Sequence, residues 1–83
     1  MKNKPIGKVT HYFDKIGVAV VKLSGPLKVG DSIRMETKDG EFKQAVESMQ
    51  VEHKMIEKAK KGDEVGMKVD QPVKEGNKVY LQS

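Results

Sequence analysis

Two short segments of this sequence carry side chains that could bind a ligand, and the first is an aromatic run at residues 11–15. His11, Tyr12 and Phe13 follow one another, and Asp14 and Lys15 come next. Flat rings stack on unpaired nucleic-acid bases, a contact worth about 1–3 kcal/mol per base, and a nearby cation could meet phosphate. The rings could equally fill a core. Adjacent strand residues face opposite ways, so we expect one of Tyr12 and Phe13 inside and leave the other as a candidate binding ring.

The second segment, residues 53–61, is rich in lysine and contains two adjacent apolar residues. It could present a cationic edge to phosphate, or its apolar pair could contact a protein partner; the candidate residues are Lys54, Met55, Ile56 and Lys58. Exposed lysine is common, so a solvated surface is the favoured interpretation of the lysines, and His53 is expected to be structural or superficial. Arg34 is the one arginine of the chain, and hence its one candidate for a bidentate phosphate or guanine contact.

Residues for catalysis are not arranged in any known pattern in this sequence. There is no cysteine, so a disulfide, a thiolate metal site and a thiol nucleophile are excluded. The two histidines, His11 and His53, lie far apart in sequence and make a zinc site improbable. A glycine-rich phosphate loop ending in Gly-Lys-Ser/Thr does not occur, so GTP binding is not expected. We therefore predict that the chain is not an enzyme and uses no cofactor.

Length and composition are those of one small domain. The chain has 83 residues, of which 16 are basic and 12 acidic, for a net charge of +4. We expect a flexible lead at residues 1–5 and a single domain at 6–83. The longest apolar run is too short to cross a membrane, and no signal peptide is recognisable, which favours a cytoplasmic protein. The positive charge suits RNA, although abundant Lys and Glu could simply solvate a small domain.

One turn pattern recurs three times and predicts the fold. Residues 27–33, 59–65 and 73–79 each read apolar, Lys, any residue, Gly, Asp or Asn, any residue, Val or Ile. Glycine adopts positive φ without steric cost, and a short Asp or Asn side chain can bond its own backbone. An alternation of apolar residues follows each copy. The chain therefore enters several β-strands from tight turns.

The predicted strands are joined by turns, and no β-α-β unit is recognisable. We expect them at residues 6–12, 16–23, 33–37, 41–51, 65–69 and 79–81, with a hairpin turn at 38–40, a bulge between Val46 and Met49 and a short helical turn near 55–61. Open sheet edges invite aggregation, and closure removes them. The predicted fold is all-β: a small, closed, antiparallel β-barrel of six or seven strands.

The order of these motifs resembles that of two known families. Residues 27–31 and 59–66, with 6–9, 16–21 and 46–49, look like the second domain of translational GTPases of the elongation factor Tu type. Residues 46–54 are closer to the C-terminal β-barrel domain of the collagenase-like peptidase family, whose members include proteins implicated in RNA hydroxylation. The resemblance implies a barrel of the translation-protein type that orients a ligand or partner. The GTPase and catalytic domains of these families are not in this sequence, and the loop before Gly30 is shorter than in elongation factors, so transfer RNA binding is not carried over.

Function is accordingly expected to be binding. The preferred hypothesis is a non-catalytic, translation-factor-like module that contacts RNA or a ribonucleoprotein. The alternative is a protein-interaction or accessory domain for a separately encoded enzyme, and a homodimer through a strand edge is a third possibility.

Overall fold

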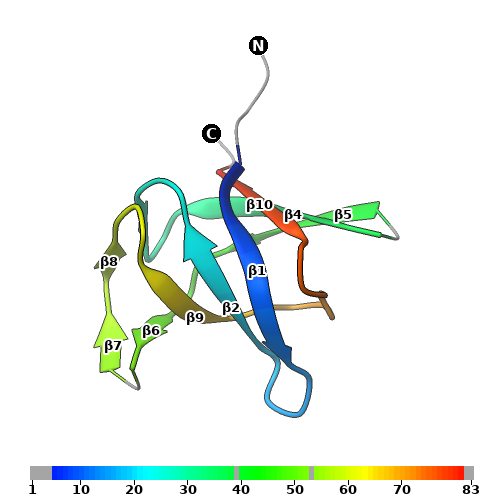
Figure 1. The fold of residues 1–83 in the computed structure, drawn as a ribbon, viewed down its shortest axis with the longest axis horizontal. Helices are drawn as coiled ribbons and strands as arrows, with labels where there is room; N and C mark the ends of the chain where they lie inside the picture. The colour runs from blue at the N-terminus through cyan, green and yellow to red at the C-terminus, as the bar shows by residue number, and fades with distance from the viewer. Residues whose placement is uncertain (1–4, 39, 53, 82–83) are drawn as a thin grey trace.

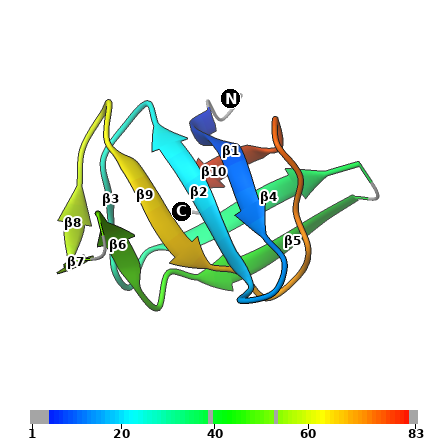
Figure 2. The ribbon, with the colours of Figure 1, turned by 60° about the horizontal axis from the view of Figure 1, so that its bottom comes forward.

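The computed structural model describes residues 5–38, 40–52 and 54–81, and every regular element in these ranges is a β-strand (Figures 1 and 2). The strands are β1 (Pro5–Phe13), β2 (Val18–Leu23), β3 (Leu27–Lys28), β4 (Ser32–Thr37), β5 (Gly40–Ala45), β6 (Met49–Val51), β7 (Lys54–Ile56), β8 (Lys58–Ala59), β9 (Glu64–Lys68) and β10 (Lys78–Leu81). The all-β prediction is confirmed. Most of the expected flexible lead, and the residues Asp39 and His53, lie outside the described residues. Among the described residues, no helix could cross a membrane.

The helical turn predicted near residues 55–61 is wrong. This segment forms β7, which pairs with β6, and β8, which pairs with β3. Met55, Ile56 and Ala59 have side chains compatible with either state, and helix propensity is a weak preference that strand pairing readily overrides. The expected bulge at residues 46–48 is instead a break between two strands. The pairing of β5 with β4 ends at Ala45, and the chain rejoins the sheet at Met49, where β6 pairs with β9.

Eight strands form one antiparallel sheet in the order β5-β4-β10-β1-β2-β9-β6-β7, and β3 and β8 form a second, two-stranded sheet. Ten strands in the described ranges thus replace the six or seven predicted, since the expected strand at 41–51 is divided into β5 and β6, and β3, β7 and β8 were not expected. The first and last strands of the described chain, β1 and β10, lie side by side near the middle of the large sheet.

Backbone pairing does not close this sheet into the predicted barrel. Its terminal strands, β5 and β7, share no ladder within the ranges that the structure describes. The sheet nevertheless curls far enough for β5 to reach the end of β9. There the Gln44 side-chain amide donates to the Lys68 carbonyl at 2.9 Å, and its carbonyl accepts the Asp70 N–H at 2.8 Å. A side chain, rather than a strand ladder, bridges this gap, and the predicted closure is therefore wrong.

The three predicted turns are confirmed and share one hydrogen-bond pattern. The Asp31, Asp63 and Asn77 side chains accept the N–H of the residue three positions earlier, at 3.1, 3.0 and 2.8 Å. The glycine before each has a φ between 91° and 99°. Each turn also exchanges two backbone bonds with one residue of a neighbouring segment. The Gly62 N–H donates to the Leu23 carbonyl, and the Leu23 N–H donates to the Asp63 carbonyl, both at 2.8 Å.

The other two turns repeat this exchange with Val46 and with Val9, at 2.8–2.9 Å. All three partner residues are buried members of the core. Each of the three turns is thus hydrogen-bonded to the backbone of a core residue, which explains why the same short pattern recurs in the sequence.

The core lies inside the curl of the sheet. Inward-facing side chains of β2, Ala19, Val21 and Leu23, alternate with outward-facing Val18, Val20 and Lys22. The same alternation on β4, β9 and β10 buries Ile33, Met35, Val65, Met67 and Val79, and the small sheet adds Leu27 and Ala59. Outward positions of β1, β2 and β9 therefore form the surface on which a ligand could bind.

Candidate functional site

A β-bulge in β1 decides which aromatic side chains are exposed. The register of β1 on β2 shifts between Val9 and His11, so that Val9 faces Val21 while Tyr12 faces Ala19. An unbroken strand would put Val9, His11 and Phe13 on one face; the extra residue reverses the phase after Thr10. Tyr12 consequently packs against the core, and Phe13 is 51% exposed. The expectation that the two rings divide between core and surface is confirmed.

The sequence-predicted site residues lie in three separate places. His11, Phe13 and Lys15 belong to the β1–β2 hairpin, where His11 Nδ1 lies 3.6 Å from Glu75 Oε1. Arg34 is on β4, which β10 separates from β1 in the sheet order. The remaining site residues lie on β7 and β8, and two strands separate β7 from β2. They are Lys54, exposed Met55, half-buried Ile56 and Lys58.

Arg34 is held by its neighbours within the sheet. Its guanidinium carbon lies 4.6 Å from the centre of the Tyr80 ring, and Nη1 lies 3.5 Å from Glu41 Oε2. A cation over an aromatic face and an adjacent carboxylate both favour this position. These contacts direct the guanidinium toward the sheet surface and give Arg34 a structural task; its predicted part in binding stays a prediction.

A row of lysines that the sequence reasoning missed crosses the outer face of the sheet. Lys78 of β10 faces Lys8 of β1, and Lys8 faces Lys22 of β2. Adjacent strands are about 4.8 Å apart, so the three stems span about 10 Å. All three are exposed. Like charges directly opposite one another on a sheet are destabilising, so this arrangement opposes folding and favours a role in binding.

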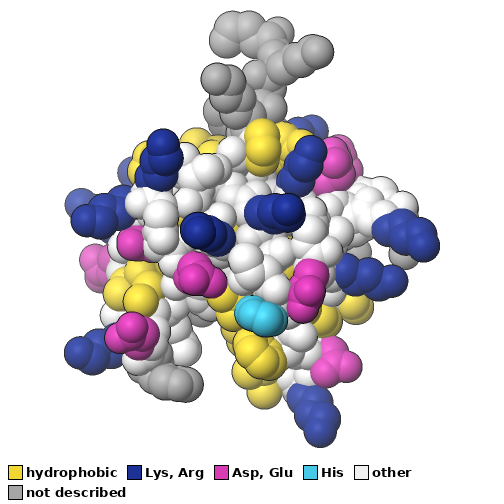
Figure 3. Space-filling view, viewed as in Figure 1, with side chains coloured by type: hydrophobic (Ala, Val, Ile, Leu, Met, Phe, Trp, Pro, Cys, Tyr) yellow, Lys and Arg dark blue, Asp and Glu magenta, His cyan; other side chains and the backbone are white. Residues whose placement is uncertain are grey.

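Among the described strand partners of this lysine row, Lys78–Lys8–Lys22, carboxylates stand at its two ends. Glu36 faces Lys78 from β4, and Glu64 faces Lys22 from β9. The two ion pairs found among the described residues involve other groups, and neither includes a lysine of the row. In Figure 3, basic side chains occupy the middle of this face, with acidic side chains around them. Lys8 therefore has a like charge on both sides.

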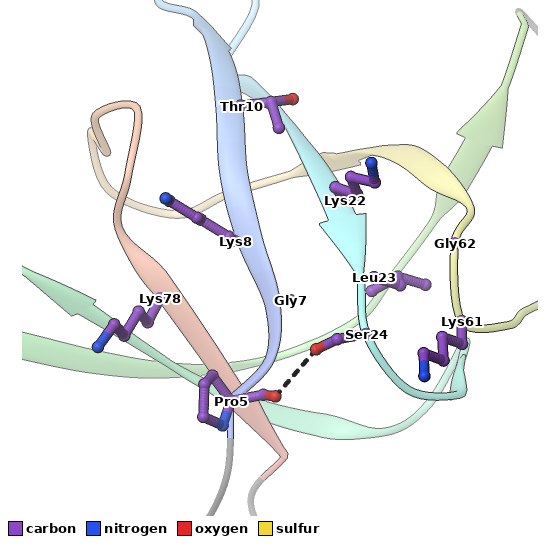
Figure 4. A pocket seen from close by; sticks show the side chains of 10 residues that line it. All are labelled: Pro5, Gly7, Lys8, Thr10, Lys22, Leu23, Ser24, Lys61, Gly62 and Lys78. Atoms are coloured by element: carbon purple, nitrogen blue, oxygen red, sulfur yellow. Dashed lines mark hydrogen bonds between the residues drawn. The ribbon is translucent and has the colours of Figure 1, made fainter.

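A hollow of about 420 Å³ opens beside the row. Figure 4 shows the lysine row around it together with Lys61, which comes from the turn before β9. The remaining lining includes Pro5, Leu23 and Ser24, and the Ser24 hydroxyl donates to the Pro5 carbonyl at 3.1 Å. No carboxylate is among the lining residues. The hollow thus combines a largely apolar wall with ammonium groups at its rim, which suits an anionic ligand.

Sequence reasoning missed the lysine row because its members are far apart in the chain and are brought together by strand register alone. Each does occupy an outward position of an expected strand or its edge, which is the one signal available. Among the described residues, no group of three His, Asp or Glu side chains could hold a metal ion. The described residues thus form an all-β domain with a row of lysines on the outer face of its large sheet.

Comparison by sequence relates this domain to a part of larger proteins. The chain is 44% identical over 77 residues to an uncharacterized protease of Methanocaldococcus jannaschii, in an alignment covering 92% of this chain and 19% of that protein. It is 35% identical over 77 residues to a collagenase of Porphyromonas gingivalis, covering 90% of this chain and 21% of the collagenase. The chain thus spans about a fifth of the length of the curated relatives it matches. No family model matches it.

Comparison by structure agrees with this relationship. Two crystal structures of the C-terminal domain of a Geobacillus thermoleovorans putative U32 peptidase share the fold at 22% identity. The TM-score is 0.91 for one, which covers 100% of this chain and 99% of that domain. It is 0.87 for a selenomethionine variant, which covers 93% and 98%. By sequence, the chain is therefore homologous to a part of the protease and of the collagenase. It shares its fold with the C-terminal domain of the U32 peptidase, and that part of the predicted resemblance is confirmed. The resemblance to elongation factors stays a prediction.

Proposed function

We propose that this domain is a non-catalytic accessory module that contacts RNA through the lysine row. The observation that carries the proposal is the juxtaposition of Lys78, Lys8 and Lys22 on adjacent strands. Ammonium groups supply the sequence-independent part of nucleic-acid binding by replacing counterions at phosphates. The relationship to one part of a larger peptidase-type protein supports the accessory role.

The row suits a phosphate backbone better than bases. No aromatic side chain lines the adjacent hollow, so base stacking there is not available. Lysine is a point charge without the planar fork that reads guanine. We expect binding with little sequence preference. A resemblance in motif order to the second domain of elongation factors is part of this proposal, and the glycine-led turns at residues 27–33 and 59–65 support it.

The experiment is a salt titration of RNA binding. Fluorescence anisotropy of a labelled single-stranded oligouridine is measured with the full chain from low to moderate salt. Each phosphate contact on a single strand contributes about −0.7 to the slope of log K against log salt, so three lysines predict a slope near −2.

The triple variant Lys8→Ala, Lys22→Ala, Lys78→Ala should lose most of this slope. Lys28→Ala, which removes an exposed lysine from the small β3–β8 sheet, is the control and should change it little. Failure of the oligouridine to bind at low salt would contradict the proposal, as would an unchanged slope in the triple variant.

The second candidate is a domain that attaches to a separately encoded enzyme, and the observation favouring it is the relationship to a protease and collagenases. It predicts a stoichiometric complex with one peptidase-type protein and no affinity for RNA. Co-purification of the two recombinant chains, followed by light scattering, separates this candidate from the first.

A further inference from the structure

An apolar patch at the hairpin end of the outer sheet face is left unexplained by RNA binding. Its members are Phe13, Ile16, Val18 and Val20, and we call them the hairpin patch. Phe13 and Ile16 are 51% and 65% exposed. Val18 and Val20 are half-buried although they face outward, on the same side of β2 as Lys22. In Figure 3, hydrophobic side chains (yellow) gather beside the histidine drawn in cyan, which is His11.

Gly66 leaves a hollow in this patch that could hold a side chain of a partner. On the outer face Gly66 faces Val20 of β2 and Gln50 of β6, and its missing side chain leaves a gap between them. A hollow of about 330 Å³ results, lined by the hairpin patch together with Gln50, Glu52, Glu64 and Gly66. A Cβ placed on Gly66 would lie 3.5 Å from Val18 Cγ1, an ordinary contact. The hollow therefore exists because glycine stands here, and no steric need of the fold requires it.

The charges at this hollow specify the partner. Its lining has two carboxylates, Glu52 and Glu64, and no basic residue. Lys22 faces Glu64 across the strands, and Lys68 faces Val18 from the end of β9, so both cations lie outside the lining. Glu52 sits at a positive φ of 51°, a conformation that most side chains avoid. An apolar floor with an acidic rim suits an apolar side chain that is flanked by basic residues.

We propose that the hairpin patch docks one aliphatic or aromatic side chain of a protein partner, in a segment where lysine or arginine stands on both sides of it. The site is separate from the lysine row and goes beyond RNA binding. The exposed area is small, so the contact is weak by itself and acts together with a second attachment.

The test uses three acetylated and amidated peptides, Gly-Arg-Leu-Arg-Gly, Gly-Glu-Leu-Glu-Gly and Gly-Arg-Ser-Arg-Gly, titrated into the ¹⁵N-labelled full chain and followed by NMR. The first should shift the amides of Val18, Val20, Gln50 and Gly66 in fast exchange. The other two should bind at least fivefold more weakly, because each lacks one of the two complementary features.

Two variants test whether the peptide binds in this hollow. Gly66→Val fills the hollow with a side chain that strands favour, and it should remove the shifts while the fold persists. Ile16→Ser changes an exposed hairpin residue and should weaken binding severalfold even if Gly66→Val fails to fold. The proposal is overturned if the arginine–leucine peptide does not bind, if its shifts lie elsewhere, if the acidic peptide binds equally well, or if both folded variants bind unchanged.

Discussion

Gln44 offers the sharpest test of how this sheet is held in its curl. Its amide makes two hydrogen bonds across the gap between β5 and the end of β9, at 2.8 and 2.9 Å. Truncation to alanine removes both and leaves the Lys68 carbonyl and the Asp70 N–H without these partners. A net hydrogen bond contributes about 0.5–1.5 kcal/mol, so Gln44→Ala should lower the free energy of unfolding by about 2 kcal/mol. In a domain of this size that corresponds to a melting temperature lower by about 8–16 °C.

The assay is urea and thermal unfolding followed by far-UV circular dichroism. The urea midpoint should fall with an unchanged m-value, because the surface exposed on unfolding remains the same. Gln71→Ala, at an exposed position in the adjacent bend, is the matched control and should change stability by less than about 0.5 kcal/mol. Gln44→Glu should be at least as damaging as alanine, because a carboxylate oxygen would then face the Lys68 carbonyl.

If Gln44→Ala unfolds like the native chain, the side-chain bridge is not what holds β5 against β9. If Gln44→Glu retains native stability, the directional pairing of donor with carbonyl is refuted. Either result would direct attention to the other contacts of this region, such as the packing of the buried β5 residue Phe42 and the backbone bonds between Val46 and the first glycine-led turn.

Two further predictions concern the glycine-led turns and the close approach of β1 to β2. Asp63→Ala removes the acceptor for the Lys60 N–H and should cost about 1 kcal/mol in urea unfolding, whereas Asp63→Asn, which keeps that acceptor, should cost less than half as much. Gly7→Ala would place a Cβ 2.6 Å from Val21 Cγ1 and 3.2 Å from a methyl of Leu23, so calorimetry should show a loss of about 1–3 kcal/mol; a neutral result would mean that β1 can move away.

The glycine-led turns could be predicted from sequence because each is a local device. The conformational need for glycine and the side-chain bond of Asp or Asn both act within four residues. Alternation in residues 18–23 and 65–69 likewise revealed the core-facing side chains, because strand geometry alone sets that period. These local rules explain why the fold class was predicted correctly.

The features that were missed depend on register and on contacts distant in sequence. Nothing near Thr10 announces the bulge that turns Phe13 outward. The lysine row requires Lys8 to be paired with residues 14 and 70 positions away, and such pairing follows from the whole topology. The same holds for Gln44, whose partners belong to another strand and its exit. Barrel closure was wrong for this reason, since the side-chain bridge cannot be told from a strand ladder in the sequence.

The adjacency of β1 and β10 constrains how the protein can assemble during synthesis. Among the described strands, only β10 pairs with both β4 and β1, so its two ladders are the backbone pairing that joins the β4–β5 hairpin to the remainder of the large sheet. During synthesis, this pairing can form only after the last described residues have been made. Loss of a few residues from that end would therefore remove strand pairing at the centre of the large sheet instead of fraying a margin.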